Sequence, residues 1–345
     1  MNRRRRNAIT AMKSMSARRR ARKNNPSVSA VHVNRPLTNI AIAFLQDPGI
    51  FFSPQIFPVV PVRKKSDSYF TWDRGDLNRD SAQAVGPGAA YPIGEKTISE
   101  TDYNCRVYKY SELVADEERE NSDEPLQLDT MATRSVMQKF AIRRDRQWAA
   151  DFFTTGVWTG STTGTDLTPA VDWDHANGTW IEDVRVQVRS LTKKGLARSG
   201  MTLTLAPAVF DAIIDHSTTL DRIQSMNSGK MLSDPSEADL AAILRIGRVI
   251  VGESVYNSAN VGATTVDAFT LGDDGALLTY APSAPALNEP SAGYTMSWTG
   301  LGGAGAAISR LRRDDRDADQ IKGRAAFAQV KTSAECGAFF DSVLA

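Results

Sequence analysis

The sequence contains few of the side chains that build metal, redox and thiol sites. Its 345 residues include only two cysteines, Cys105 and Cys336, and three histidines, all far apart along the chain. Two cysteines cannot form a disulfide framework, and five scattered ligands leave little material for a zinc site. We therefore expect no metal, no cofactor, and no redox or thiol chemistry.

Long apolar runs are also missing. The run from Ile40 to Leu45 has six residues, whereas a membrane-spanning helix needs about 20. The basic segment before it contains no apolar region of the kind found in a secretory signal. We therefore expect no membrane-spanning helix, no membrane partner and no secretory signal.

Acidic residues are absent from the first 46 positions, which contain eleven Lys and Arg residues. The net charge of +1 thus combines this basic segment with a net charge of −10 over residues 47–345. A basic run repels itself and favours an anionic partner, of which nucleic acid is the obvious one. A solubilising tail, an organellar transit segment and docking onto the acidic remainder of another copy are the alternatives. The residues expected to contact nucleic acid or an acidic scaffold are Arg3, Arg4, Arg5, Arg6, Arg18, Arg19, Arg20, Arg22 and Lys23.

Residues 47–62 combine high proline content with apolar side chains. This segment, DPGIFFSPQIFPVVPV, has four prolines among Phe, Ile and Val residues. Proline at this density disfavours a regular helix and an interior strand. Because the apolar side chains still need burial, we expect an extended connector that packs across a domain or a neighbouring copy.

Two strands rich in Tyr, Phe, Thr and Trp are expected at residues 67–73 and 102–110, with an irregular Gly- and Pro-containing tip between them. A long two-stranded arm is marginal in water by itself. The pattern therefore predicts an arm that needs the support of a partner surface.

The rest of the chain predicts an α+β fold with mixed sheets. Residues 124–153 have apolar side chains near helical spacing and predict one helix of roughly 40 Å. Further helices are expected from Trp180 to Leu196, after Pro207, and after the capping-box pattern Asp234–Glu237. Short strands are expected at residues 201–205, 248–251, 268–271, 276–280, 294–298, 326–331 and 338–340.

Two short motifs invite a catalytic interpretation. Gly272–Gly275, with the sequence GDDG, has the paired aspartates of a polymerase metal site, but Asp-Gly between strands is also a common hairpin turn. The glycine-rich segment 300–305 lacks the Lys-Ser/Thr that a phosphate-binding loop requires. We therefore interpret both as turns or loops and predict that the protein is not an enzyme.

Two charged segments are assigned to the surface. His175 lies near Asp172 and Asp174 in a loop rich in glycine and threonine, and this pattern is typical of a solvated turn. Residues 310–324 mix basic and acidic side chains and are expected to form a solvated loop. In an assembling protein, charged contacts between subunits are the alternative for 310–324.

The order of these segments resembles the major capsid proteins of tailed bacteriophages with the HK97-type fold. The segments that carry the resemblance are IFPVVPV at 56–62, KKSDSYF at 64–70, WDRGD at 72–76, YNCRVYKYSELVADEERENSD at 103–123 and RRDRQWA at 143–149. The resemblance is most specific over residues 50–155.

The resemblance implies an HK97-like fold with five parts. These are a basic N-terminal arm and proline-rich connector (1–62), an extended E-loop hairpin that reaches over an adjacent subunit (63–110), a P domain with a long spine helix (111–200), an A domain (201–320), and strands that return to the P domain (321–345). The E-loop residues expected at contacts between subunits are Tyr69, Phe70, Trp72, Arg74, Asp76, Arg79 and Tyr91.

The resemblance also implies a structural function. Many copies, as pentamers and hexamers, would assemble in the host cytoplasm into an icosahedral shell that encloses the double-stranded DNA genome in the virion. The implied partners are copies of the chain and packaged DNA, and the resemblance allows scaffolding, portal and decoration proteins. The alternatives are an encapsulin-type compartment shell with enzyme cargo, a DNA-binding protein that acts as a small oligomer, and an enzyme that uses Gly272–Gly275.

Overall fold

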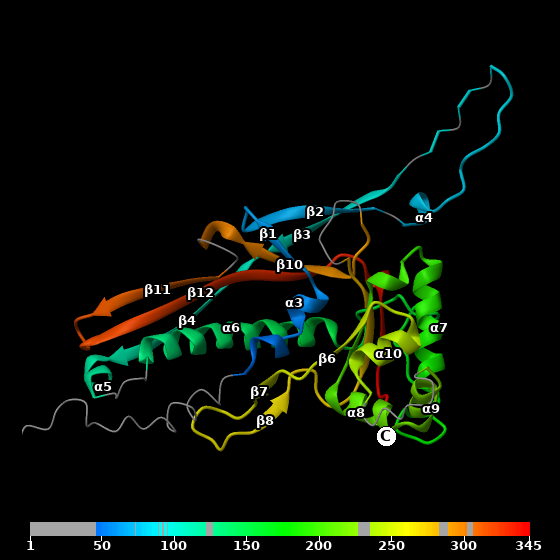
Figure 1. Cartoon of the computed structure of the whole chain (residues 1–345). Helices are drawn as coiled ribbons and strands as arrows, with labels where there is room; N and C mark the ends of the chain where they lie inside the picture. Colours follow the sequence, from blue (N-terminus) through cyan, green and yellow to red (C-terminus); the bar gives the residue numbers. More distant parts are fainter. Residues whose placement is uncertain are drawn as a thin grey trace, which may run out of the picture. The chain divides into compact units, whose positions relative to one another are not determined.

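The computed structural model describes residues 46–72, 74–88, 90–91, 93–94, 96–121, 127–226, 235–282, 289–301 and 306–345 (Figure 1). The chain divides into two compact units, one made of residues 1–44 and 117–127 and the other of residues 45–116 and 128–345. The described part of the first unit contains most of the short helix α5 (Asp116–Glu120). Both larger sheets and the long helix belong to the second unit.

A five-stranded sheet is built around one long strand, β12 (Ala318–Lys331). The sheet follows the order β1–β10–β12–β11, and β4 also pairs with β12. Strand β1 runs parallel to β10, and the other pairings are antiparallel. The other strands are β1 (Val59–Val62), β4 (Arg106–Ala115), β10 (Gly293–Trp298) and β11 (Ala306–Arg313).

The long helix α6 (Leu128–Phe152) lies along this sheet (Figure 1). Its 25 residues include neither glycine nor proline, so nothing interrupts its hydrogen-bond ladder. The helix approaches β12 most closely at Gly323, where an added Cβ atom would lie 2.3 Å from Val136 and 2.5 Å from Phe140. Any larger residue at position 323 would therefore push the helix away from the sheet.

The two halves of α6 belong to different hydrophobic cores. Val136 and Phe140 pack with residues of β4 and β12, whereas Trp148 and Phe152 belong to the larger core. With 3.6 residues per turn, Val136 and Phe152 lie on nearly opposite faces of the helix. One helix therefore joins both cores.

The larger core surrounds a four-stranded sheet with the order β13–β9–β5–β6. All five residues of β5 are buried, which indicates that this strand is covered on both faces. The strands are β5 (Met201–Leu205), β6 (Arg248–Val251), β9 (Ala276–Tyr280) and β13 (Gly337–Phe340). The helices of this region are α7 (Trp180–Lys193), α8 (Pro207–Asp215), α9 (Ser217–Met226) and α10 (Glu237–Leu244). A separate pair of short strands is formed by β7 (Val255–Asn257) and β8 (Asp267–Phe269).

The proline-rich connector packs against its own chain. It forms a 3-10 turn (Pro48–Ile50), one turn of helix as α3 (Ser53–Ile56), and then the edge strand β1. Phe52 and Phe57 are buried and meet the ring of Trp148 edge to face, with centroids 5.5 and 5.6 Å apart. Such aromatic pairs stabilise a core beyond the area they bury. The connector is therefore part of the larger core.

A buried carboxylate fixes the connector to α6. Asp145 is completely buried and accepts hydrogen bonds from the backbone N–H groups of Phe52 (3.1 Å) and Ser53 (3.3 Å) and from the Ser53 hydroxyl. Burial raises the pKa of Asp145, while the Ser53 hydroxyl and the nearby Arg144 oppose that shift. The Asp145 carboxylate thereby satisfies the free N–H groups of the N-cap residue and of the first residue of α3.

Most predicted elements are confirmed. The strands at 201–205, 248–251 and 276–280 have the predicted bounds, and α7 starts at the predicted Trp180. Helix α6 corresponds to the helix expected at 124–153, of which residues 124–126 lie outside the described residues. The connector packs across a domain of its own chain, which was one of the two alternatives.

Other expectations are wrong in detail. Residues 310–324 are not a loop: they form the second half of β11, a tight turn and the first half of β12. The expected strand at 102–110 is divided at Cys105 between β3 (Ile98–Asn104) and β4. The capping box of α10 is formed by Ser236 and Asp239 rather than by Asp234 and Glu237. Strand pairing crosses position 320, since β10 and β11 pair with β12 and β13 pairs with β9, and the domain division implied by the resemblance remains a prediction.

We expect Asp145→Ala to lower the free energy of unfolding by about 3 kcal/mol, because it leaves buried donors without an acceptor. Urea unfolding of the purified protein, followed by tryptophan fluorescence, measures this change. Asp151→Ala is the matched control, since Asp151 is exposed near the end of the same helix, and it should change stability by less than about 0.5 kcal/mol. Equal losses in the two variants would contradict a special role for Asp145.

Candidate functional site

The most unusual surface is an extended hairpin made of β2 (Ser66–Trp72) and β3. The strands pair antiparallel, with Ser66 opposite Asn104. Between them the chain passes through α4 (Arg74–Leu77) and runs out in a long irregular loop, drawn in cyan at the upper right of Figure 1. We call residues 66–104 the extended hairpin.

The base of the extended hairpin is attached to its own chain. The Tyr69 hydroxyl donates to the carbonyl oxygen of Lys331 (3.0 Å) at the end of β12. The Cys105 N–H donates to the carbonyl oxygen of Lys65 (2.8 Å). Burial raises the pKa of Tyr69, so its hydroxyl remains a neutral donor at physiological pH. These contacts fix the direction in which the hairpin leaves the sheet.

A forked ion pair holds the hairpin where the irregular loop begins. Arg74 donates from Nε and Nη2 to the two carboxylate oxygens of Glu335, at 2.6 and 3.2 Å. This pairing lowers the pKa of Glu335. Across the loop, Asp76 accepts a hydrogen bond from the Thr97 N–H (3.0 Å), which lowers the pKa of Asp76. The two carboxylates brace the start and the end of the loop.

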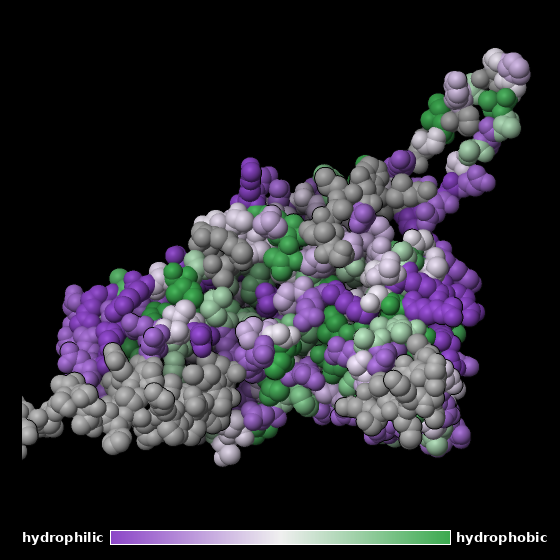
Figure 2. Space-filling model, in the orientation of Figure 1, coloured by the Kyte–Doolittle hydropathy of each residue, from purple (hydrophilic) through white to green (hydrophobic). Residues whose placement is uncertain are grey.

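The tip of the extended hairpin exposes large apolar side chains. Tyr91 is 88% and Ile93 is 93% exposed, and Phe70 on β2 is 64% exposed. Figure 2 shows hydrophobic residues interspersed with polar ones along this loop. Apolar groups held this far from the core gain stability only by contacting another surface.

The residues predicted for contacts between subunits fall into two groups. Those bonded within their own chain are Tyr69, Arg74, Asp76 and Arg79. Those exposed to solvent with no such bond described here are Phe70 and Tyr91. The side chain of Trp72 lies outside the described residues, as do all nine predicted basic residues between Arg3 and Lys23.

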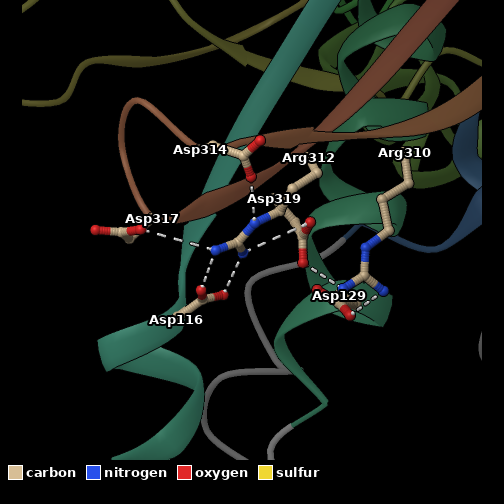
Figure 3. Close-up of polar contacts among 7 residues, drawn as sticks. All are labelled: Asp116, Asp129, Arg310, Arg312, Asp314, Asp317 and Asp319. Carbon is tan, nitrogen blue, oxygen red and sulfur yellow. Dashed lines mark hydrogen bonds and ion pairs between the residues drawn. The ribbon is translucent and has the colours of Figure 1, made fainter.

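A cluster of ion pairs joins the first residue of α5 to β11, to the turn after β11, to β12 and to the start of α6 (Figure 3). Arg312 makes two bonds to Asp116, at 2.6 and 2.8 Å, and lies within 4.0 Å of Asp314, Asp317 and Asp319. Hydrogen bonding to Asp116 raises the pKa of Arg312. Arg310 bridges the buried Asp319 to Asp129, the latter at 3.2 Å.

This cluster explains why the charged segment 310–324 is ordered as strands. The aspartates neutralise both arginines within one chain, and contacts between subunits, the alternative for this segment, remain a prediction. Sequence reasoning missed the cluster because Asp116 and Arg312 are almost 200 positions apart. The only local signal was the alternation of Ile321, Gly323 and Ala325 with polar or charged residues.

The motifs considered for catalysis have structural roles. Asp274, in the GDDG motif, accepts hydrogen bonds from the backbone N–H groups of Gly275 (2.6 Å) and Val343 (2.9 Å). The bond to Val343 holds the C-terminal segment in place. His175 accepts the Asn177 N–H (3.1 Å) within its own turn. Neither arrangement resembles an acid–base or nucleophilic set.

The described residues contain no group of three or more His, Cys, Asp or Glu side chains that could hold a metal ion. Within the same ranges, no helix is both long and apolar enough to cross a membrane. A cavity of about 400 Å³ lies between the connector and β6, lined among others by Glu237, Arg248 and Glu253. It holds one cation and two carboxylates and no nucleophile, so it offers no catalytic constellation.

We expect the attachment of the extended hairpin to weaken in acid. The pKa of Glu335 is lowered in the folded protein. The stability that Glu335 contributes is therefore present above its unfolded pKa, and it is lost as the pH falls through its folded pKa. The protection factors of the amides of residues 74–79, which correct hydrogen exchange for its intrinsic dependence on pH, should therefore fall below about pH 4.5. Arg74→Ala should raise the same exchange at neutral pH, with less than about 1 kcal/mol lost from global stability. Protection that is unchanged in Arg74→Ala would contradict this assignment.

Comparison with family models and with curated proteins found no match. Solved structures do match. A phage-related protein from Bordetella bronchiseptica RB50 is 14% identical, with a TM-score of 0.66 over 90% of this chain and 97% of that chain. A chain of the mature capsid of bacteriophage PhiM1 is 12% identical, with a TM-score of 0.52 over 82% of this chain and 84% of that chain. A chain of the cyanophage P-SCSP1u capsid is 11% identical, with a TM-score of 0.52 over 83% and 86%.

At these identities the comparisons concern the fold, and they agree over more than four fifths of each chain. The mixed α+β fold of this chain is therefore similar to the folds of these phage and phage-related proteins.

Proposed function

We propose that the chain is a major capsid protein, which assembles into an icosahedral shell around the double-stranded DNA genome of a tailed phage. The observation that supports this most strongly is the exposed apolar tip of the extended hairpin, in a chain with the fold of phage capsid proteins. Tyr91 and Ile93 at the tip are about 90% exposed, and apolar side chains exposed in this way favour aggregation of a monomer. Burial of the tip against a neighbouring subunit would take these side chains out of water.

In this proposal the extended hairpin is the E-loop and α6 is the spine helix. The sheet around β12 together with α6 forms the P domain, and the sheet around β5 with α7 to α10 forms the A domain. The E-loop lies over an adjacent subunit, P domains meet edge to edge, and A domains meet around the five- and six-fold axes. Many modest contacts, repeated by symmetry, then close the shell.

The alternatives are separated by charge and chemistry. An encapsulin-type compartment would use the same shell for an enzyme cargo, but eleven basic residues and no acidic residue among the first 46 favour a nucleic acid as the content. A small-oligomer DNA-binding protein would not need the apolar tip. The enzyme alternative loses support, because one carboxylate oxygen of Asp274 in the GDDG motif accepts hydrogen bonds from backbone N–H groups of its own chain.

Expression of the chain alone should yield hollow shells, or pentamers and hexamers, in negative-stain electron microscopy. The double variant Tyr91→Ser/Ile93→Ser should keep the native stability of the subunit but lose most particles, since each large apolar side chain buried at a contact contributes about 2 kcal/mol. Val261→Ser is the matched control, because Val261 is fully exposed on the loop between β7 and β8.

Undiminished particle yield in the double variant would contradict the role of the tip. Native protein that forms only monomers or dimers, and that binds DNA in a salt-dependent way, would favour the small-oligomer DNA-binding protein instead.

Deletion of residues 2–23 should weaken genome packaging or the control of shell size while the subunit still folds. The reason is that this deletion removes ten of the eleven basic residues in the first 46, together with the counterion release they would provide on DNA. DNA content per particle and the particle diameter measure the effect. Full particles of native size would contradict a role for the arm in either process.

A further inference from the structure

Three exposed basic side chains form a stripe along α6. Lys139, Arg143 and Arg146 are all exposed and follow the spacing i, i+4, i+7. With 3.6 residues per turn and a rise of 1.5 Å per residue, they lie within about 60° of one another around the helix and span about 10 Å along it. We call these three residues the basic stripe.

Aromatic rings orient both arginines of the basic stripe. The Arg143 guanidinium lies 5.3 Å from the ring centroid of Tyr108 on β4, and that of Arg146 lies 4.1 Å from the ring centroid of Tyr256 on β7. Tyr108 is itself fixed, because its hydroxyl donates to Gln147 and its ring stacks on Phe327. A guanidinium held by its face on a ring keeps its N–H edges available for an anion.

No carboxylate among the described residues forms an ion pair with the basic stripe. The aspartates of α6 are engaged or remote: Asp129 pairs with Arg310, Asp145 is buried against α3, and Asp151 lies on another side of the helix. This contrasts with Arg310 and Arg312, whose charges are neutralised inside the chain. The stripe is therefore an uncompensated positive surface.

The most basic part of the sequence joins the fold next to the stripe. The side-chain amide of Gln46 donates to the Val255 carbonyl (2.6 Å) and accepts the Val255 N–H (3.3 Å). Val255 immediately precedes Tyr256, the ring beneath Arg146. The 45 residues before Gln46 contain all eleven of the basic residues in the first 46. The chain therefore continues toward this basic segment from a residue that is bonded beside the stripe.

We propose that the basic stripe is a second nucleic-acid contact, which binds the phosphates of a DNA duplex without reading its sequence. The proposal rests on the proposed function, which supplies the duplex. Three cations over about 10 Å match about three consecutive phosphates of one strand. Residues 1–46 of the same chain supply eleven further basic residues.

The extended hairpin of a second copy is the competing anionic occupant, since residues 66–104 contain seven acidic and three basic residues. Several of its carboxylates are already engaged within the chain. Asp67 pairs with Lys64 (3.0 Å), Asp76 accepts the Thr97 N–H, and Glu100 accepts the Ser68 hydroxyl. Phosphates, which are fully ionised, are the better partners for two oriented guanidinium groups.

The test compares two triple variants of the full chain, both of which remove three positive charges. Lys139→Gln/Arg143→Gln/Arg146→Gln removes the stripe. Lys109→Gln/Lys322→Gln/Arg324→Gln is the control. Gly323 faces α6, so its neighbours Lys322 and Arg324 lie on the opposite face of the sheet. Lys109 of β4 is opposite Arg324 in the strand register, and it therefore lies on the same face as Arg324. The affinity of soluble, unassembled protein for a labelled duplex of about 30 base pairs is measured between about 50 and 300 mM NaCl. Thermal unfolding checks that both variants are folded.

We expect the stripe variant to lower the magnitude of the slope of log K against log salt by about 3, because each phosphate contact contributes about 0.9. The control variant should keep the native slope. An unchanged slope in the stripe variant would overturn the proposal. Equal losses of slope in both variants would also overturn it, because they would show that binding responds to net charge alone.

Particle formation in the same preparations separates this inference from the proposed function. Stripe variants that keep the native slope but no longer assemble would make the stripe a contact between copies and overturn the proposal. If even the native chain forms no particles while the stripe variant loses its slope, the shell function fails and the DNA contact stands.

Discussion

Helix α6 has to satisfy two hydrophobic cores on nearly opposite faces, and the rest of the structure depends on this constraint. Its first half covers β12 through Val136 and Phe140, and its second half enters the larger core through Trp148 and Phe152. A helix in this position needs apolar residues that change face halfway along its length, so it does not have one continuous apolar stripe. Surfaces not used by either core remain for other contacts, and the basic stripe lies on one of them.

Charge is used in two different ways in this chain. At the β11–β12 turn, arginines and aspartates neutralise one another and order a strand pair that would otherwise be a solvated loop. On α6, by contrast, arginines are oriented by tyrosine rings and keep their charge for an external partner. The groups that surround each arginine therefore decide whether it forms ion pairs within the chain or keeps its charge for a partner. The composition of the sequence does not reveal these surroundings.

Local sequence signals predicted the elements whose stability is mainly local. The strands at 201–205 and 276–280 are apolar runs bounded by turn residues, and the structure has the same bounds. Strand β11 was missed because its charged residues become strand-like only beside partners on β12. The role of Asp145 was missed because its donors lie more than 90 positions earlier in the sequence. Within the candidate site, the exposed tip followed from its composition, whereas the basic stripe required knowing that Tyr108 and Tyr256 approach the same helix.

The parallel pairing of β1 with β10 has a consequence for the order in which the chain folds. Val59 is opposite Thr295, so the strand made early in synthesis has its partner encoded more than 230 residues later. Because a ribosome releases the N-terminal part first, the connector emerges long before β10 exists. Phe52 and Phe57 can pack on α6 once Trp148 has been made, but β1 stays unpaired until nearly the whole chain has been synthesised. The segment that follows residues 1–46 is therefore completed last, because its place in the main sheet depends on a strand near the end of the chain.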